Sequence, residues 1–172
     1  MIKGLRELDK ETIKFYNNNA QRYAKWRSIE KIDLPQKIFL NEIKSSGKII
    51  DLGCGTGEKT IWFHKQGLKV TALDASYGML KQFDKIKNIN IQKMDLSKIS
   101  FSKKYDGIWA SFSIQHLEKP EQNLLFKKVS RALNKSGIFY VGIHEGNKIY
   151  RDNLNRLYVP RTEIDLRKIF RK

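Results

Sequence analysis

Apolar residues recur at two different spacings along the chain, and the spacing changes from one segment to the next. Residues 9–27 place apolar side chains three or four positions apart, which predicts an amphipathic helix with Asp9 as its N-cap. A second helix is predicted to begin after Asp33, with Pro35 tolerated in its first turn, and to end before Gly47. The N-terminal part of the chain is therefore expected to consist of two helices.

Short apolar runs in the rest of the chain indicate buried strands separated by helical segments. One helix is predicted to start near Glu58, a second to be capped by Ser76, and a third to hold Pro120 in its first turn. Residues 134–137 are predicted to turn into the last strand. The predicted strands cover residues 48–52, 69–74, 89–94, 105–111 and 138–143. Because strands and helices alternate, the pattern favours an α/β fold with a mostly parallel sheet.

The pattern is weaker in the last part of the chain. Residues 147–161 are polar and are expected to be irregular, whereas Thr162–Asp165 fits a capping box that predicts a helix up to Arg171. No internal repeat or linker divides the sequence, so we expect a single domain over residues 1–172. Within it we distinguish N-terminal lid helices, a ligand-binding core and a C-terminal tail with a helix, at residues 1–47, 48–146 and 147–172.

The composition adds information about the cellular compartment. Cys54 is the sole cysteine, which excludes an internal disulfide and fits a reducing compartment. No apolar run approaches the roughly 20 residues that cross a bilayer. Charged residues near the N-terminus leave no signal-peptide core. We therefore expect a cytoplasmic protein with no membrane partner.

The net charge of +16 admits two interpretations. It can mark a surface that binds RNA, DNA or another polyanion. It can also be compositional, because lysine far outnumbers arginine and the lysines are spread from Lys3 to Lys172 without an arginine-rich block. A nucleic-acid partner stays open at this point, but the even spread of charge favours a small-molecule partner.

A glycine-rich segment between the first predicted strand and the helix after it is the strongest chemical signal. Gly53, Gly55 and Gly57 follow the pattern Gly-x-Gly-x-Gly, whereas dinucleotide-binding loops follow Gly-x-Gly-x-x-Gly. Asp51 stands two positions before the first glycine, where it can orient the loop or reach a cationic amino group through water. Asp74 ends the next predicted strand, and a carboxylate there can accept hydrogen bonds from ribose hydroxyls. The segment therefore predicts a nucleoside-binding site.

Asp51–Gly57 resembles motif I of the class I S-adenosylmethionine-dependent methyltransferases, and the resemblance extends over about residues 12–146. Residues 105–111 resemble the fourth-strand motif of these enzymes, and residues 129–139 resemble their lead-in to the fifth strand. Ser113-Ile-Gln-His-Leu117 resembles the sequence that follows the fourth strand in many small bacterial members. The resemblance implies a Rossmann-like, doubly wound sheet with strand order 3-2-1-4-5, and S-adenosylmethionine as the cofactor.

The resemblance also implies roles for single residues. Asp74 would bind the ribose of the cofactor, Met79 would pack beside the adenine, and Asp95 would meet the adenine amino group. Tyr16 and Tyr23 lie on a segment that resembles the helix closing over the cofactor, although their helical spacing fits core positions equally well. The expected cofactor-binding residues are Asp51, Gly53, Gly55, Gly57, Asp74, Met79, Asp95, Leu96, Ser111, Tyr16 and Tyr23.

His116 is the candidate for catalysis, because it follows the fourth predicted strand at the carboxyl edge, where ligands bind in such sheets. A helix-cap or packing role is the alternative for this residue. His144 follows the fifth strand and is a weaker candidate, while His64 lies within a helix and is expected to be structural. The three histidines and Cys54 show no metal-ligand spacing, so no metal site is predicted.

Complete class I methyltransferases usually add an antiparallel pair of strands after the fifth, and this pair is not evident in the sequence before Lys172. The fifth strand would then be an exposed edge, which can pair with another chain. A naturally shortened enzyme, a homodimer that covers this edge, and a truncated, inactive cofactor-binding protein all fit this expectation. We expect methyl transfer to an unidentified small-molecule acceptor, with methylation of tRNA or rRNA as the enzymatic alternative.

Overall fold

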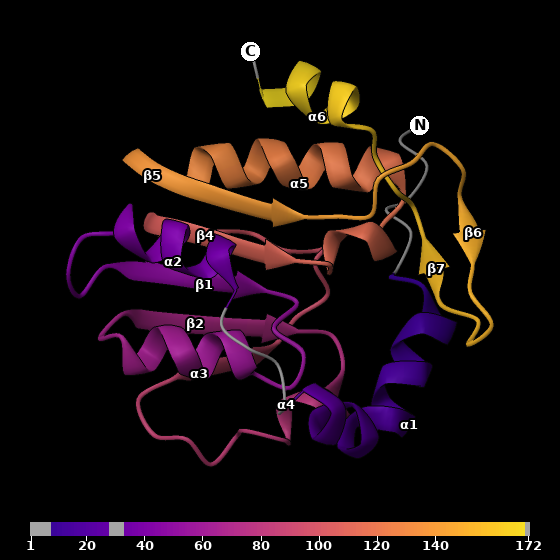
Figure 1. Cartoon of the computed structure of the whole chain (residues 1–172), viewed down its shortest axis with the longest axis horizontal. Coiled ribbons are helices and arrows are strands. Elements are labelled where there is room, and N and C mark those ends of the chain that lie inside the picture. The colour runs from indigo at the N-terminus through magenta and orange to yellow at the C-terminus, as the bar shows by residue number, and fades with distance from the viewer. Residues whose placement is uncertain (1–7, 28–32, 171–172) are drawn as a thin grey trace.

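Five parallel strands form the central sheet in the computed structural model, which describes residues 8–27 and 33–170 (Figure 1). The strands are β1 (Lys48–Leu52), β2 (Lys69–Asp74), β3 (Asn90–Lys93), β4 (Tyr105–Ser111) and β5 (Leu133–Gly142). Their order in the sheet is β3-β2-β1-β4-β5, and every pairing is parallel. The predicted fold class and strand order are therefore confirmed.

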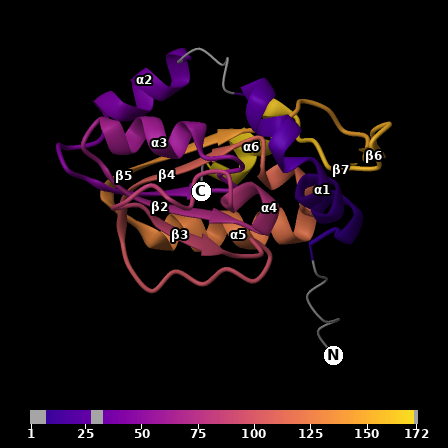
Figure 2. The ribbon, with the colours of Figure 1, turned by 90° about the horizontal axis from the view of Figure 1, so that it is seen from below.

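Helices lie on both faces of this sheet and at its carboxyl edge (Figures 1 and 2). They are α1 (Lys10–Arg27), α2 (Leu34–Asn41), α3 (Glu58–Lys65), α4 (Tyr77–Leu80), the 3-10 turn η1 (Ile114–His116), α5 (Lys119–Ala132) and α6 (Glu163–Phe170). Figure 2 shows α2 and α3 on one face and α5 on the other. None of the described helices is at once long enough and apolar enough to cross a bilayer.

Three helices begin at the N-cap residues that the sequence predicted. Asp9 accepts a hydrogen bond from the Thr12 N–H at 2.9 Å, and Asp33 forms a capping box with Gln36. Ser76 accepts from the Met79 N–H at 3.2 Å. A side-chain oxygen at the N-cap satisfies a backbone donor that has no partner inside the helix, so these three positions fix where the chain turns helical.

The central strands are buried on both sides, so each contributes to two separate cores. Ile50 and Ile108 face the cluster that includes α5, whereas Ile49 and Trp109 face the cluster formed with α2 and α3. The Trp109 ring stacks on Tyr140 of β5 with their centroids 3.8 Å apart. Burial of apolar side chains on both faces explains why these strands are continuous apolar runs rather than alternating ones.

The last strand of the sheet begins earlier than predicted. Tyr105 pairs with Leu133, but Gly107 already pairs with Ile138, so residues 134–137 form an irregularity within β5. The expected turn is therefore a bulge inside the strand, and the turn-forming residues Asn134 to Gly137 are its cause. Among the described residues no strand pairs with the outer edge of β5.

A short antiparallel hairpin follows β5, so the expectation that residues 147–161 are irregular and that no such hairpin is present was wrong. Its strands are β6 (Tyr150–Arg151) and β7 (Leu157–Tyr158), and they form a sheet of their own. Asp152 builds the turn by accepting hydrogen bonds from the N–H groups of Leu154 and Arg156 at 3.0 and 2.9 Å. Strands of two residues are too short to show an alternating pattern, which is why the sequence did not reveal them.

The β6–β7 hairpin lies beside α1 at the carboxyl ends of the parallel strands (Figures 1 and 2). The Leu157 N–H donates to Thr12 Oγ1 at 2.9 Å, although the two residues are 145 positions apart. Arg151 donates to both carboxylate oxygens of Asp9, at 2.6 and 3.0 Å. The hairpin and α1 therefore form one continuous wall over the edge of the sheet where ligands bind in this class of fold.

Candidate active site

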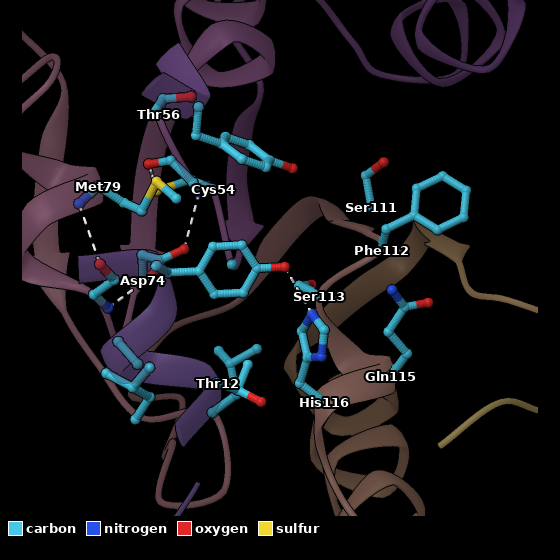
Figure 3. Close-up of a pocket in the computed structure, with 18 of the residues that line it drawn as sticks. Thr12, Cys54, Thr56, Asp74, Met79, Ser111, Phe112, Ser113, Gln115 and His116 are labelled. Carbon is cyan, nitrogen blue, oxygen red and sulfur yellow. Dashed lines mark hydrogen bonds between the residues drawn. The ribbon is translucent and has the colours of Figure 1, made fainter. Parts of the chain in front are cut away.

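A cavity of about 430 Å³ lies between the carboxyl ends of the strands and the wall formed by α1 and the hairpin. Figure 3 shows Cys54, Asp74 and Met79 on one side of it, and Phe112, Gln115 and His116 on the other. Its volume falls within the range of small-molecule sites. The expected site residues that line it are Asp51, Gly53, Gly55, Asp74, Met79, Leu96, Ser111, Tyr16, Tyr23 and His116.

The glycine loop leaves β1 with its backbone in the left-handed region. Gly53 has φ +73°, and a Cβ added there would lie 2.2 Å from the Cβ of Ser113. Gly55 has φ +57°, and a Cβ added there would meet no atom within 4 Å. The first glycine is therefore required by packing inside the protein, whereas the second leaves open space next to the cavity, where a ligand can approach the backbone.

Asp74 connects the end of β2 to this loop. Its Oδ2 accepts from the Gly55 N–H at 2.9 Å and its Oδ1 accepts from the Ser76 N–H at 2.7 Å. Burial raises the pKa of this carboxyl above its ordinary value, while these backbone hydrogen bonds act in the opposite direction. Each carboxylate oxygen can accept a second hydrogen bond, so Asp74 can hold hydroxyl groups of a ligand in the cavity.

Asp51 is buried at the end of β1, where Thr60 Oγ1 donates to its Oδ2 at 2.6 Å. Burial raises the pKa of Asp51 to about 7, and the neighbouring carboxylates of Asp74 and Glu58 act in the same direction. Among the described residues lining the cavity, the three acidic ones, Asp51, Glu58 and Asp74, all lie on this side. Lys59 lines the same half, so three acidic residues stand beside one basic residue, and this half of the cavity favours a ligand that carries positive charge.

His116 is held by hydrogen bonds on both ring nitrogens. Its Nδ1 lies 2.6 Å from the carbonyl oxygen of Leu157, and because a carbonyl only accepts, Nδ1 carries the proton. Burial lowers the pKa of His116 to about 4, so the ring is neutral and its Nε2 is an acceptor. The hydroxyl of Tyr16 lies 3.1 Å from Nε2 and donates to it (Figure 3). Burial raises the pKa of Tyr16, which keeps that hydroxyl protonated.

Arg156 of the hairpin completes this chain of hydrogen bonds. Its Nη1 donates to the Tyr16 hydroxyl at 3.3 Å, and its Nη2 forms a salt bridge with Asp152 at 2.6 Å. The guanidinium also lies over the rings of Tyr16 and Tyr158, with its carbon 5.6 and 5.4 Å from their centroids. Arg156 donates a hydrogen bond to Tyr16, and Tyr16 donates one to His116. The phenol of Tyr16 therefore lies between the positively charged guanidinium and the neutral imidazole.

The sequence did not indicate Phe112, Arg156 and Tyr158 as site residues, although all three line the cavity. The last two lie on the hairpin that was expected to be irregular. The turn-forming residues between Arg151 and Arg156, flanked by tyrosines, are the signal that could have revealed it. His144, a weaker candidate, also lines the cavity and stacks on Tyr158 with centroids 5.1 Å apart.

Two expected site residues do not line the cavity. Gly57 precedes α3 and packs on Phe83, whose ring would lie 2.5 Å from an added Cβ. The carboxylate of Asp95 accepts from the Leu8 N–H at 3.2 Å and from the N–H and hydroxyl of Ser97 at 2.9 and 2.7 Å. Asp95 therefore holds the segment before α1, whereas the neighbouring Leu96 lines the cavity.

Comparison with known proteins shows to which family the chain belongs. The sequence model of the "Methyltransferase domain" family matches residues 49–137, which is more than half of the chain. An uncharacterized methyltransferase of Staphylococcus carnosus is 28% identical over 124 residues, which cover 70% of this chain and 59% of the relative. The chain spans 31–59% of the length of the curated relatives reported for it, and 51–59% of the first three.

Solved structures show the same fold. The 1,6-didemethyltoxoflavin-N1-methyltransferase of Burkholderia thailandensis, solved with 1,6-didemethyltoxoflavin and S-adenosylhomocysteine, aligns with a TM-score of 0.77. It is 18% identical, over 94% of this chain and 75% of its own. A DhpI–SAH complex aligns with a TM-score of 0.68 at 18% identity, over 94% of this chain and 85% of its own. The chain belongs to the methyltransferase domain family, and its resemblance to the class I, S-adenosylmethionine-dependent methyltransferases is confirmed in sequence and in fold.

Proposed function

We propose that this protein binds S-adenosylmethionine in the cavity and transfers its methyl group to a small-molecule acceptor. The proposal rests on one observation. The unobstructed backbone of Gly55 and the carboxylate of Asp74, which are joined by a hydrogen bond, line the same cavity. When bound, S-adenosylmethionine supplies a methyl group on a positively charged sulfur, which needs little further activation. The main task of the protein is then to align the two reactants and exclude water.

The residues around the loop fit this cofactor. Asp74 accepts hydrogen bonds from the ribose hydroxyls, and Gly55 allows the cofactor to lie against the loop. Asp51 and Glu58 provide the negative charge that a cofactor with an ammonium and a sulfonium group requires. Apolar and lid contacts come from residues that share this cavity, namely Met79, Leu96, Ser111, Tyr16 and Tyr23.

His116 and Tyr16 act together on the acceptor in this proposal. An acceptor that loses a proton during methylation needs a group that receives it. The neutral Nε2 of His116 can take the proton of the Tyr16 hydroxyl as that hydroxyl takes the proton of the acceptor. The resulting imidazolium remains bonded to the carbonyl oxygen of Leu157 through Nδ1. His116 is then a proton acceptor that works through Tyr16.

Calorimetric titration with S-adenosylhomocysteine tests the cofactor half of the proposal. Replacing Asp74 with alanine should weaken binding by about 1–3 kcal/mol, because charge-assisted hydrogen bonds are lost. The matched control is Glu163→Gln, which changes an exposed acid of α6 outside the cavity and should leave the affinity unchanged. Tight binding of NADH with no response to S-adenosylhomocysteine would refute the cofactor assignment.

Methyl transfer itself is tested by incubating the protein with labelled S-adenosylmethionine and a metabolite extract that contains RNA. The proposal predicts label in the small-molecule fraction, whereas label in RNA would contradict it. Replacing His116 with asparagine keeps a donor for the Leu157 carbonyl but removes the acceptor that faces Tyr16. Turnover should fall by roughly 10²–10⁴-fold with unchanged affinity for S-adenosylhomocysteine. Unchanged turnover would leave His116 with a packing role.

A further inference from the structure

The half of the cavity opposite the glycine loop is walled by aromatic rings from separate parts of the chain. Neighbouring rings contact each other edge to face or in stacks, with centroids 5.0–5.8 Å apart. The aromatic residues of this wall are Tyr16, Tyr23, Trp26, Phe112 and Tyr158, joined by the rings of His116 and His144. A wall of this kind offers flat π surfaces rather than fixed charges.

The polar groups of this half fit a neutral or weakly acidic acceptor. The acidic residues among the described lining residues lie on the glycine-loop side, while the guanidinium of Arg156 lies on this side. Aromatic walls can also bind cations, but the cavity here is lined by the guanidinium of Arg156 and not by the carboxylate of Asp152 with which it pairs, which disfavours a cationic acceptor. The hydroxyl oxygen of Tyr16 can take a proton from an O–H or N–H group of the acceptor while Nε2 of His116 takes the proton of that hydroxyl.

Phe112 is the most unusual member of this wall. The described non-glycine residues with positive φ are Ser46, Asn88, Phe112 and Asn155, and Phe112 alone among these carries a bulky apolar side chain. Small polar residues adopt this conformation readily, whereas a phenylalanine with φ +53° is strained. Backbone strain of this kind persists where the surrounding structure enforces it, and it is concentrated at functional sites.

The surroundings of Phe112 show how the strained turn is held and what it achieves. The Phe112 N–H donates to the carbonyl oxygen of Gly142 at 2.8 Å, and the hydroxyl of the next residue, Ser113, donates to the carbonyl oxygen of Leu52. The ring contacts His144 edge to face at 5.6 Å, yet 50% of the residue is exposed. The turn therefore does not bury the ring in the core but presents it at the cavity.

We propose that the acceptor is an aromatic molecule, a planar ring bearing a hydroxyl or ring N–H group, and that it stacks on the exposed ring of Phe112. This inference rests on the proposed methyl transfer. The oxygen or nitrogen of the acceptor forms the bond to the methyl carbon as the carbon–sulfur bond breaks and its electron pair stays on sulfur. The proton of the acceptor leaves to the Tyr16–His116 pair, so the atoms and charges balance.

Two naphthalene-type alcohols test the class of acceptor. The probes are 2-naphthol and its saturated counterpart decahydro-2-naphthol, which have the same carbon skeleton and hydroxyl group but differ in the π surface. Binding of each is measured by saturation-transfer NMR and titration in the presence of S-adenosylhomocysteine. The proposal predicts that 2-naphthol binds about tenfold more tightly, the size expected for one stacked ring. Equal affinity for the two probes, or no binding of 2-naphthol, would overturn it.

Variants of Phe112 separate stacking from a structural role. Phe112→Gly removes the ring and relieves the positive φ, so the affinity for 2-naphthol should fall about tenfold while the thermal midpoint is not lowered. Phe112→Leu keeps the apolar bulk and should lose the preference for the aromatic probe. Ser46→Gly relieves a positive φ of 57° outside the cavity and should leave the binding of both probes unchanged.

The outcomes distinguish this inference from the proposed function. Unchanged affinity of Phe112→Gly for 2-naphthol would overturn the role of Phe112, even if S-adenosylhomocysteine binds normally. Loss of S-adenosylhomocysteine binding in the wild-type protein would contradict the proposed function, and the two probes titrated alone would still report whether the wall prefers an aromatic ring. A drop in the thermal midpoint of Phe112→Gly together with weaker cofactor binding would assign Phe112 a structural role instead.

Discussion

Replacing Asp51 with asparagine removes an acid that the fold buries at the end of β1. In the unfolded chain this carboxyl has its ordinary pKa of 3.8, whereas burial in the folded protein raises the pKa to about 7. The folded state therefore binds the proton more tightly than the unfolded state. Stability from this group is fully present below pH 3.8 and is lost as the pH rises through about 7.

The magnitude follows from the two pKa values of Asp51. The interval from 3.8 to about 7 corresponds, at about 1.36 kcal/mol per pH unit, to a loss on the order of 4 kcal/mol. The asparagine amide does not titrate, but it has a similar size and its oxygen can accept the hydrogen bond from Thr60. We therefore expect Asp51→Asn to be as stable as the wild type near pH 4 and more stable by a few kcal/mol above pH 7.

Urea unfolding of the ligand-free protein at several pH values between 4.5 and 8.5 measures this difference. His116 titrates over part of the same range with the opposite sign, because its pKa is lowered from 6.5 to about 4 and its contribution is lost as the pH falls through that interval. Comparing Asp51→Asn with the wild type at each pH cancels this term. Thr60→Val is the control, since loss of its hydrogen bond should raise the pKa of Asp51 further and extend the loss of stability to higher pH than in the wild type. Parallel curves for wild type and Asp51→Asn from pH 5 to 8 would refute the reasoning.

Two further predictions concern the glycine loop and the wall above it. Gly53→Ala should destabilise the protein by several kcal/mol in urea unfolding, roughly the cost of overpacking plus a left-handed backbone, because its Cβ would lie 2.2 Å from that of Ser113. Gly67→Ala, with φ +85° and no atom within 4 Å, should cost only about 1 kcal/mol. Arg151→Ala should speed hydrogen exchange at the start of α1, because it removes the ion pair with Asp9 that lowers the pKa of that carboxyl to about 2. The same speeding should appear in the wild type in high salt or as the pH falls from 3.8 through about 2.

The parts of the fold that could be predicted are those whose signals are local. The caps at Asp9 and Asp33 are set by a side chain and a backbone N–H three residues away, so they are visible in a few letters of sequence. The central strands are buried on both faces and therefore appear as apolar runs. The strand order, by contrast, came from the resemblance to a known family, since no local pattern in the chain encodes which strands are neighbours.

The features that could not be predicted depend on contacts between distant segments. The two-residue strands of the hairpin are too short to show a period, and they are held by α1 through Thr12 and Asp9. Asp95 has the position expected of an adenine-binding acid, but the Leu8 N–H occupies one of its oxygens. The conformation of Phe112 is likewise held by a distant residue, because its N–H donates to the carbonyl oxygen of Gly142 in β5. In each case the deciding partner lies far away in the sequence.

The two halves of the cavity consequently differ in what a family comparison can say about them. The family match covers residues 49–137, which include Asp51, Asp74 and His116 on the strands and the turn after β4. Tyr16 and the hairpin, which supply the phenol beside His116 and the cation next to it, lie outside that match. The proposed cofactor half thus lies within the family match, whereas Tyr16 and the hairpin contribute to the proposed acceptor half from outside it. The family match therefore bears on the proposed cofactor side, whereas the proposed acceptor class rests on the aromatic wall, whose preference for a π surface the two naphthalene-type probes measure.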